Sequence, residues 1–321
     1  MADHRHHHHA HGHSHGHGHG HSHGVSENAD ARRLTVAFAL IVALMVAEVV
    51  VGVLAHSLAL LSDAAHMLTD AAALAMSLVV LRLMRRPAAG NLTFGFRRAE
   101  ILSAQANGGT LLVLALLIVY EGVSRLVTPP AAEGKALLAV ALLGVVINLA
   151  ATWQLAKANR ESMNIEGSFQ HLLTDLAAFV FTAIAGAAII TTGFTRADGI
   201  ASLIIAAIML RAAYGLLRDS GRVLLEAAPE GMDADAIGRA LAAQPGVVSI
   251  HDLHLWSIGS GFPALSAHVL VGSDDDCHAI RRALEHMLDH DYGIDHTTLQ
   301  VDHSTAGRLM SIGTERSHHH H

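Results

Sequence analysis

The sequence predicts a polytopic α-helical membrane protein in which six transmembrane helices precede a small α/β domain. Two observations predict this class. Of the 321 residues, 51% are hydrophobic and 15% are charged, and the mean hydropathy is +0.38, which is too apolar for a soluble domain of this length. After about residue 228 the long apolar segments give way to short amphipathic ones, which indicates a soluble appendage.

The apolar segments each approach or exceed the ~20 residues that cross the hydrocarbon core of a bilayer. They cover residues 34–55, 58–84, 99–127, 134–158, 168–192 and 197–218. Basic residues gather on one side, whereas the opposite loops hold only Arg125, Lys135 and Arg196. An even number of spans with this bias places both termini in the cytoplasm. We therefore expect a transmembrane domain over residues 31–225 in a lipid bilayer.

Both ends of the chain are expected to be disordered tails. Residues 1–30 alternate His with Gly or Ser and have no apolar periodicity. Their imidazoles could buffer Zn, Ni or Cu near a pore entrance, or the segment could be a solvated tail with incidental metal affinity. Residues 305–321 form the second tail, and the four histidines at its end indicate an affinity-tag remnant.

The segment 226–304 is predicted to fold as a separate two-layer domain. Helical spacing covers 233–243 and 274–290, and alternating patterns predict strands at 247–256, 263–271 and 297–302. A Gly-Ser-Gly turn at 259–261 joins the first two strands. The α-β-β-α-β order predicts helices on one face of a short sheet.

Two segments of the same form lie inside apolar spans. They are His66-Met67-Leu68-Thr69-Asp70 and His171-Leu172-Leu173-Thr174-Asp175. In each, an imidazole and a carboxylate are four residues apart, so a helix places them on one face. Ionisable groups in hydrocarbon are costly and by default mark an ion or proton pathway, although a single pair could also be structural, hydrogen-bonded to a neighbouring helix. Together the two pairs supply two nitrogens and two carboxylate oxygens, a tetrahedral set suited to Zn²⁺.

This ligand chemistry predicts an exchange of metal for protons. Imidazole and carboxylate bind metal only when deprotonated, so a divalent cation and protons exclude each other at the site. If the site opens alternately to each side, zinc leaves the cytoplasm and protons enter. A membrane-bound metal sensor or store without transport is the alternative, but it leaves the intramembrane pairs unexplained.

Other classes of function are disfavoured. The HxxxD pattern lacks the glutamate base of H-E-x-x-H, and four protein ligands leave no open position for a catalytic water, so we expect no enzyme. The single Cys277 excludes an intramolecular disulfide framework and a cysteine-based zinc site. No basic stripe with interleaved aromatic residues suggests nucleic acid as a partner.

Several other polar residues fall within the predicted spans. Asp63 precedes His66 by three residues on the same face, where it could orient the imidazole or attract cations at the entry. Glu48, Asn107 and Asn148 could line a cavity or bridge helices, and we favour bridging for the two asparagines. Asp198 begins the sixth span and could be a helix cap.

The sequence resembles the zinc-transporting branch of the cation diffusion facilitators over residues 34–303. The resemblance rests on S-L-A-L-L-S-D-A-A-H-M-L-T-D at 57–70, T-F-G-F-R-R-A-E-I-L at 93–102, H-L-L-T-D in the fifth span and H-D-L-H-L-W at 251–256. It implies a homodimer of six-span protomers in the inner (plasma) membrane, each with a cytoplasmic metallochaperone-like domain, exchanging Zn²⁺ for H⁺. The family's transport ligands carry over onto His66, Asp70, His171 and Asp175. Relatives with Asp in place of the first His tend to accept cadmium, iron or manganese, so retention of both histidines favours zinc.

The resemblance also implies metal sites near the dimer contact of the cytoplasmic domain. The matching positions are His251, His268, His296 and Asp302. Independently, His296 and Asp302 share strand parity and could face one side of the sheet. His254 has the opposite parity to His251, which makes it a candidate surface residue. His303 could be a ligand or a bystander.

Overall fold

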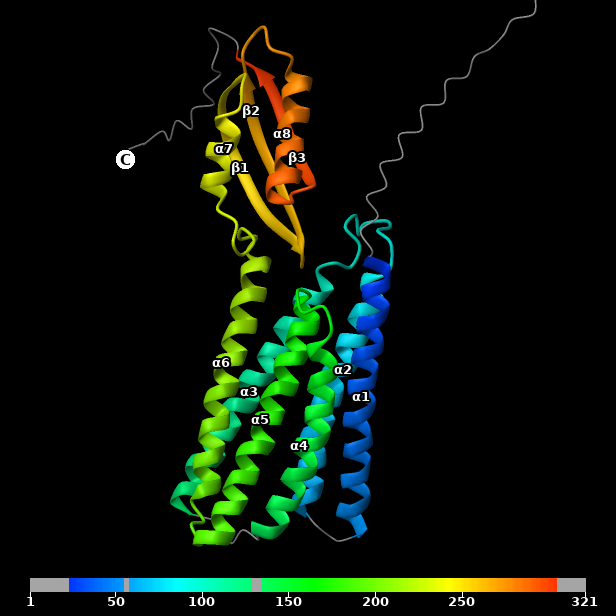
Figure 1. Cartoon of the computed structure of the whole chain (residues 1–321), viewed down its shortest axis with the longest axis vertical. Helices are drawn as coiled ribbons and strands as arrows, with labels where there is room; N and C mark the ends of the chain where they lie inside the picture. The colour runs from blue at the N-terminus through cyan, green and yellow to red at the C-terminus, as the bar shows by residue number, and fades with distance from the viewer. Residues whose placement is uncertain (1–22, 55–57, 129–133, 305–321) are drawn as a thin grey trace, which may run out of the picture.

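The computed structural model describes residues 23–54, 58–128 and 134–304, and within these ranges it leaves out the side chains of 23–28, 51–52, 58–63, 65–66 and 134–137. Of the predicted tails at 1–30 and 305–321, residues 1–22 and 305–321 lie outside the described residues. Residues 23–30, by contrast, are helical and form the start of the first helix, so the predicted tail extends too far there. Figure 1 shows a bundle of long helices with the small C-terminal domain at one end. We call this end of the bundle the domain end and the opposite end the far end.

Six helices form the bundle, and each is long and apolar enough to cross a membrane, as the sequence predicts. They are α1 His23–Leu54, α2 Leu58–Met84, α3 Ala99–Val127, α4 Gly134–Ala156, α5 Met163–Thr192 and α6 Ala197–Leu224. The fifth begins five residues before the predicted 168, because Asn164 and Ser168 lower the local hydropathy while facing neighbouring helices rather than lipid.

Two apolar clusters hold the bundle together. One joins α1, α2, α4 and α5 through fully buried residues such as Ile41, Leu74 and Leu172. The other joins α3 and α6 through residues such as Leu111 and Ala213. Large apolar side chains elsewhere on the helices are exposed, as expected where lipid is the neighbour.

The C-terminal domain has the predicted α-β-β-α-β order. It consists of α7 Ala234–Ala242, β1 Val247–Gly259, β2 Phe262–Val271, α8 Cys277–Tyr292 and β3 His296–His303. The strands lie in the order β1-β2-β3, with β1–β2 antiparallel and β2–β3 parallel. Both helices contribute apolar residues to a core with one face of the sheet, which leaves the other face of the sheet uncovered by them. The order is thus confirmed, although the turn shortens to Ser260-Gly261.

Aspartates begin both helices of this domain. Asp233 accepts from the amides of Asp235 and Ala236, as its predicted capping role requires. Asp276 accepts from the amides of Ala279 and His278, at 3.0 Å each, and these hydrogen bonds lower the pKa of its carboxyl group. The second helix therefore begins at residue 277 rather than at the predicted 274.

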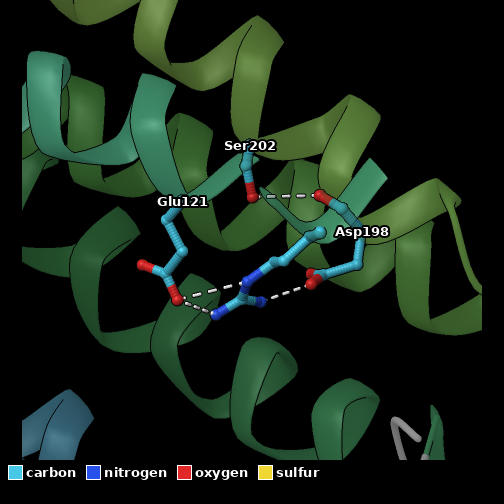
Figure 2. Close-up of polar contacts among 4 residues, drawn as sticks. Glu121, Asp198 and Ser202 are labelled. Atoms are coloured by element: carbon cyan, nitrogen blue, oxygen red, sulfur yellow. Dashed lines mark hydrogen bonds and ion pairs between the residues drawn. The ribbon is translucent and has the colours of Figure 1, made fainter. Parts of the chain in front are cut away.

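An ion-pair cluster ties α3 to α6 at the far end of the bundle (Figure 2). The Arg125 guanidinium donates to the carboxylates of Glu121, one turn earlier on α3, and of Asp198, in the first turn of α6. Asp198 also accepts through its backbone oxygen from the Ser202 hydroxyl at 3.0 Å. The Asp198 carboxylate pairs with another helix and receives no capping hydrogen bond, so its role is to join α3 and α6.

This cluster predicts an unequal response to neutralising its two acids. The Asp198 side chain is 8% exposed and that of Glu121 is 56% exposed. Loss of the Asp198 negative charge therefore removes the buried partner of the Arg125 guanidinium, whereas loss of the Glu121 charge removes an exposed partner that water can replace. We expect Asp198→Asn to lower the free energy of unfolding by about 1–3 kcal/mol, and the matched control Glu121→Gln by less than about 1 kcal/mol. Thermal unfolding of the detergent-solubilised protein measures both, and equal losses would contradict this account of the cluster.

Candidate metal centre

Helices α2 and α5 bring together three of the four predicted intramembrane ligands. The Nε2 atom of His171 lies 2.8 Å from Oδ1 of Asp70 and 3.9 Å from Oδ2 of Asp175. One ligand atom from each of these residues lies within 4.8 Å of the others. The His171 side chain is 1% exposed, so the group lies inside the bundle rather than at the lipid surface. Among the described residues this is the one group with a geometry suited to a metal ion.

The fourth predicted ligand, His66, lies within α2 but its side chain is outside the described residues. The same holds for Asp63. The helical backbone of α2 is continuous from Leu58 to Met84, so positions 66 and 70 share one face of it.

The local sequence explains why the two helices approach closely here. Ala71 of α2 and Leu172 of α5 are buried in one apolar cluster, and the small alanine allows close packing beside the ligands. Toward the domain end, the Ser168 hydroxyl donates to the Ser77 hydroxyl at 2.7 Å, and Asn164 Nδ2 donates to the Ser77 carbonyl at 3.0 Å. These hydrogen bonds fix α2 against α5 between the ligands and the domain end.

Two ligand atoms of the centre have no hydrogen-bond partner among the described residues. They are Nδ1 of His171 and Oδ2 of Asp175, both buried. An unpaired buried carboxylate oxygen is costly, and a cation is one group that relieves the cost. The arrangement can therefore hold either a proton, between His171 and Asp70, or a divalent cation shared by all three residues.

The two asparagines do not bridge helices as we had favoured. Neither amide atom of Asn107 has a hydrogen-bond partner among the described residues, and Asn148 Nδ2 donates to the Gly144 carbonyl of its own helix at 3.2 Å. Both side chains are 1% exposed. The bridging prediction was wrong because sequence cannot show whether a neighbouring helix offers a partner at the right level.

A second cluster of histidines lies on the uncovered face of the sheet in the C-terminal domain. His251 pairs with His268 across β1 and β2, and their ring centroids are 5.3 Å apart. The Asp252 carboxylate lies 3.2 Å from Nε2 of His254 and 3.8 Å from Nε2 of His268. The structure thus brings together two of the predicted metal ligands, His251 and His268, with Asp252 and His254, which were not predicted as ligands.

A β-bulge corrects the parity predicted for His254, whose side chain is 65% exposed, as expected of a surface residue. The register pairs His251 with His268 and His254 with Ser266, so three residues of β1 advance against two of β2. Asp252 within the bulge has a φ of 55°. His254 consequently faces the same side as His251, because the extra residue reverses the parity on which the prediction was based.

The third strand places Asp302 near this cluster and His296 away from it. Asp302 lies beside Leu270, two positions along from His268 on the same face, and it accepts from Gln300 at 2.9 Å. His296 lies beside Ala264, which is four residues before His268 on β2. At ~3.3 Å per residue this places His296 roughly 13 Å along the strand direction from the level of His268. Its ring packs against Phe94 and Phe262, with centroids 5.7 and 5.5 Å apart. His303 contacts the Asp275 carbonyl at 2.9 Å through Nε2.

Sequence reasoning missed the role of Glu100, which joins the C-terminal domain to the bundle. Glu100 is 2% exposed in the first turn of α3, and its carboxylate accepts from the Ser260 amide at 2.7 Å and the Ser162 hydroxyl at 3.0 Å. The Ser260 hydroxyl in turn accepts from the amide of Met163, the first residue of α5. The β1–β2 turn is therefore hydrogen-bonded to the start of the helix that carries His171 and Asp175.

Aromatic packing supports the same junction. The Arg97 guanidinium lies 4.4 Å from the centroid of the Phe262 ring, next to the turn. A Cβ at Gly259 would lie 3.0 Å from a Glu100 carboxylate oxygen, so a side chain there would push this carboxylate away from its present position. The family-like segment 93–102 contains both Arg97 and Glu100, and this was the signal that could have pointed to the junction.

Two profiles of one protein family match consecutive parts of the chain. The profile of the cation efflux transmembrane domain matches residues 34–225, and that of the cytoplasmic domain of cation efflux proteins matches residues 229–304. Both domains of the structure therefore have counterparts in the same family.

Similar proteins extend over most of the chain. The zinc transporter ZitB of Escherichia coli (strain K12) is 38% identical over 301 residues, covering 92% of this chain and 96% of that protein. The cadmium, cobalt and zinc/H(+)-K(+) antiporter of Bacillus subtilis (strain 168) is 36% identical over 307 residues, covering 92% of this chain and 98% of that protein. Among solved structures, the metal-bound C-terminal domain of the CzcD transporter from Cuprividus metallidurans is 32% identical, covers 22% of this chain and 99% of that chain, and has a TM-score of 0.22.

The junction at Glu100 predicts how the turn responds to a small change. Glu100→Ala removes both acceptor oxygens, so the Ser260 amide and the Ser162 hydroxyl lose their partner, at a cost of about 1–3 kcal/mol for each buried donor. We expect the amide of Ser260 to exchange with deuterium on the order of tenfold faster in the full-length protein, as measured by hydrogen exchange. The matched control is Glu226→Ala, which removes only an exposed ion pair with Arg98. Unchanged exchange at Ser260 in Glu100→Ala would contradict the junction.

Proposed function

The chain belongs to the cation efflux family of membrane transporters, and we propose that it exports Zn²⁺ from the cytoplasm in exchange for H⁺ through His66, Asp70, His171 and Asp175. Six spanning helices make it a multi-pass membrane protein, and the family is one of metal cation efflux.

The 2.8 Å contact between Nε2 of His171 and Oδ1 of Asp70 carries the proposal. A hydrogen bond of this length between these atoms requires a proton between them. Zn²⁺ binds to the same kinds of atom, Nε2 of imidazole and a carboxylate oxygen, and only when they are deprotonated. The pair can therefore hold a proton or a metal ion but not both, which is the exclusion that an exchanger needs.

The distances suit the replacement of that proton by zinc. Zn²⁺ at ~2.1 Å from each ligand in a tetrahedron separates its ligand atoms by roughly 3.4 Å. The separations from Nε2 of His171, 2.8 and 3.9 Å, lie on either side of this value, so displacements of roughly half an ångström would bring both to the zinc geometry. His66, one turn from Asp70 on α2, would supply the second imidazole.

The names of the relatives support this choice of cargo. ZitB is named as a zinc transporter, and the protein from Bacillus subtilis is named as an antiporter for cadmium, cobalt and zinc. We also propose that the domain end of the bundle faces the cytoplasm and that the protein resides in the inner (plasma) membrane. The basic residues near this end, such as Arg85 and Arg160, agree with the orientation.

We also propose that the protein is a homodimer and that His251, His268 and Asp302 bind metal on the uncovered face of the sheet. These residues lie on one face of β1, β2 and β3, and Asp252 and His254 extend the cluster. His296, by contrast, would contribute to the junction with the bundle, where its ring packs against Phe94 and Phe262.

Removal of one proposed ligand at a time tests the assignment of the transport site. In proteoliposomes with an imposed pH gradient, we expect Asp175→Ala and His66→Ala to reduce zinc flux on the order of a hundredfold or more, since loss of even an outer-shell partner costs 10–100-fold in metal affinity or activity. The control is Glu121→Gln, a carboxylate at the far end with a largely exposed side chain. Wild-type flux in Asp175→Ala would show that the site lies elsewhere.

Proton release on binding tests the exclusion of protons by metal. We expect zinc binding to release at least one proton per ion, so the apparent dissociation constant should rise about tenfold per proton released for each unit fall in pH below the pKa of the displaced proton. Calorimetry in buffers of different ionisation enthalpy counts the protons. His171→Ala should release fewer protons than the wild type, and equal release by both would contradict the role of the imidazole.

A further inference from the structure

Buried polar side chains gather where α2, α3 and α5 pack together, on the domain side of the metal centre. On α5, Asn164 and Ser168 precede His171 at helical spacing, so the three share one face. On α3, Ser103 and Asn107 are one turn apart and share a face as well. All four of these polar side chains are at most 2% exposed.

Three of them carry polar atoms with no hydrogen-bond partner among the described residues. These atoms are Oγ of Ser103, Nδ2 and Oδ1 of Asn107, and Oδ1 of Asn164. An unpaired buried polar atom lowers the free energy of unfolding by about 1–3 kcal/mol. The presence of four such atoms on neighbouring helices therefore needs a functional explanation. Helix bridging accounts only for Nδ2 of Asn164, which donates to the Ser77 carbonyl of α2. Asn107 makes no hydrogen bond to any described residue, so bridging does not explain its burial.

The three residues occupy two levels between the domain end and the metal centre, with Asn107 nearer the centre than Ser103 and Asn164. Asn107 lies against Gly167, where an added Cβ would come within 3.3 Å of its Nδ2 atom. Gly167 is four residues before His171, so Asn107 lies roughly 6 Å to the domain side of the centre at 1.5 Å per residue. Ser103 is one turn nearer the domain end, at about the level of Asn164.

We propose that Ser103, Asn107 and Asn164 form a hydrated transit site, at which a divalent cation sheds part of its water shell on its way between the cytoplasm and the metal centre. The proposal rests on the proposed direction of transport and names its cytoplasmic route. Neutral amide and hydroxyl oxygens replace water around a cation without the affinity of a carboxylate. A site on a conduction route must bind weakly enough to release its ion, which suits this set.

Water access to these positions tests the proposal without any transport. The chain has one cysteine, so Cys277→Ser gives a background without thiols. In this background we expect Asn107→Cys and Asn164→Cys to react with a small, charged methanethiosulfonate reagent from the cytoplasmic side of everted vesicles. The matched control is Leu111→Cys, one turn further along α3, where the native side chain is fully buried in apolar surroundings. We expect at least tenfold faster reaction at position 107 than at 111, and slower reaction in the presence of Zn²⁺.

A transport measurement separates a transit site from a merely structural one. Asn107→Leu keeps the volume and removes both polar atoms, so we expect about tenfold slower initial zinc flux with unchanged stoichiometry of zinc binding at equilibrium. Asn107→Ser, which retains an oxygen, should recover flux to within about threefold of the wild type.

Two results would overturn the proposal: reaction at position 107 as slow as at 111, or wild-type flux in Asn107→Leu. Absence of zinc flux in the wild type would instead refute the proposed function, and the labelling rates would still decide whether water reaches these residues.

Discussion

The desolvation of one imidazole and two carboxylates between α2 and α5 is the constraint on which the rest of the structure depends. His171 is 1% exposed, and the side chains of Asp70 and Asp175 are 15% and 18% exposed. In such surroundings an excess of negative charge is expensive, so the group needs a proton or a cation to neutralise it. The proposed coupling between metal and protons would then follow from burial itself, because either ion neutralises the same group.

Helix α5 connects this centre to the C-terminal domain. It carries His171 and Asp175, presents Asn164 and Ser168 toward α2 and α3, and its first residue is hydrogen-bonded to Ser260 of the β1–β2 turn. A change in the position of that turn would therefore act directly on the first turn of the ligand-bearing helix. At the other end of the bundle, the Arg125–Asp198 ion pair holds α3 and α6 together as one unit.

The sequence was sufficient where one residue type in one local pattern decides the outcome. Hydropathy predicted the six spans, helical spacing predicted the pairing of His171 with Asp175, and capping residues predicted the start of α7 at Asp233. It was insufficient where the partner is distant along the chain. Glu100 and Ser260 are separated by 160 positions, and Arg125 and Asp198 by 73, so neither contact has a local signal. The bulge at Asp252 likewise depends on pairing with β2, and it reversed the predicted direction of His254.

The central claim is that protons and zinc compete for one site that opens to both sides, and the static head of transport tests it most directly. Proteoliposomes are loaded with equal zinc concentrations on both sides, and a pH gradient is imposed as the only driving force. The account predicts that zinc accumulates on the acidic side, and that the accumulation grows with the size of the gradient. Zinc that stays evenly distributed under a sustained pH gradient, while still equilibrating when given a zinc gradient, would contradict it.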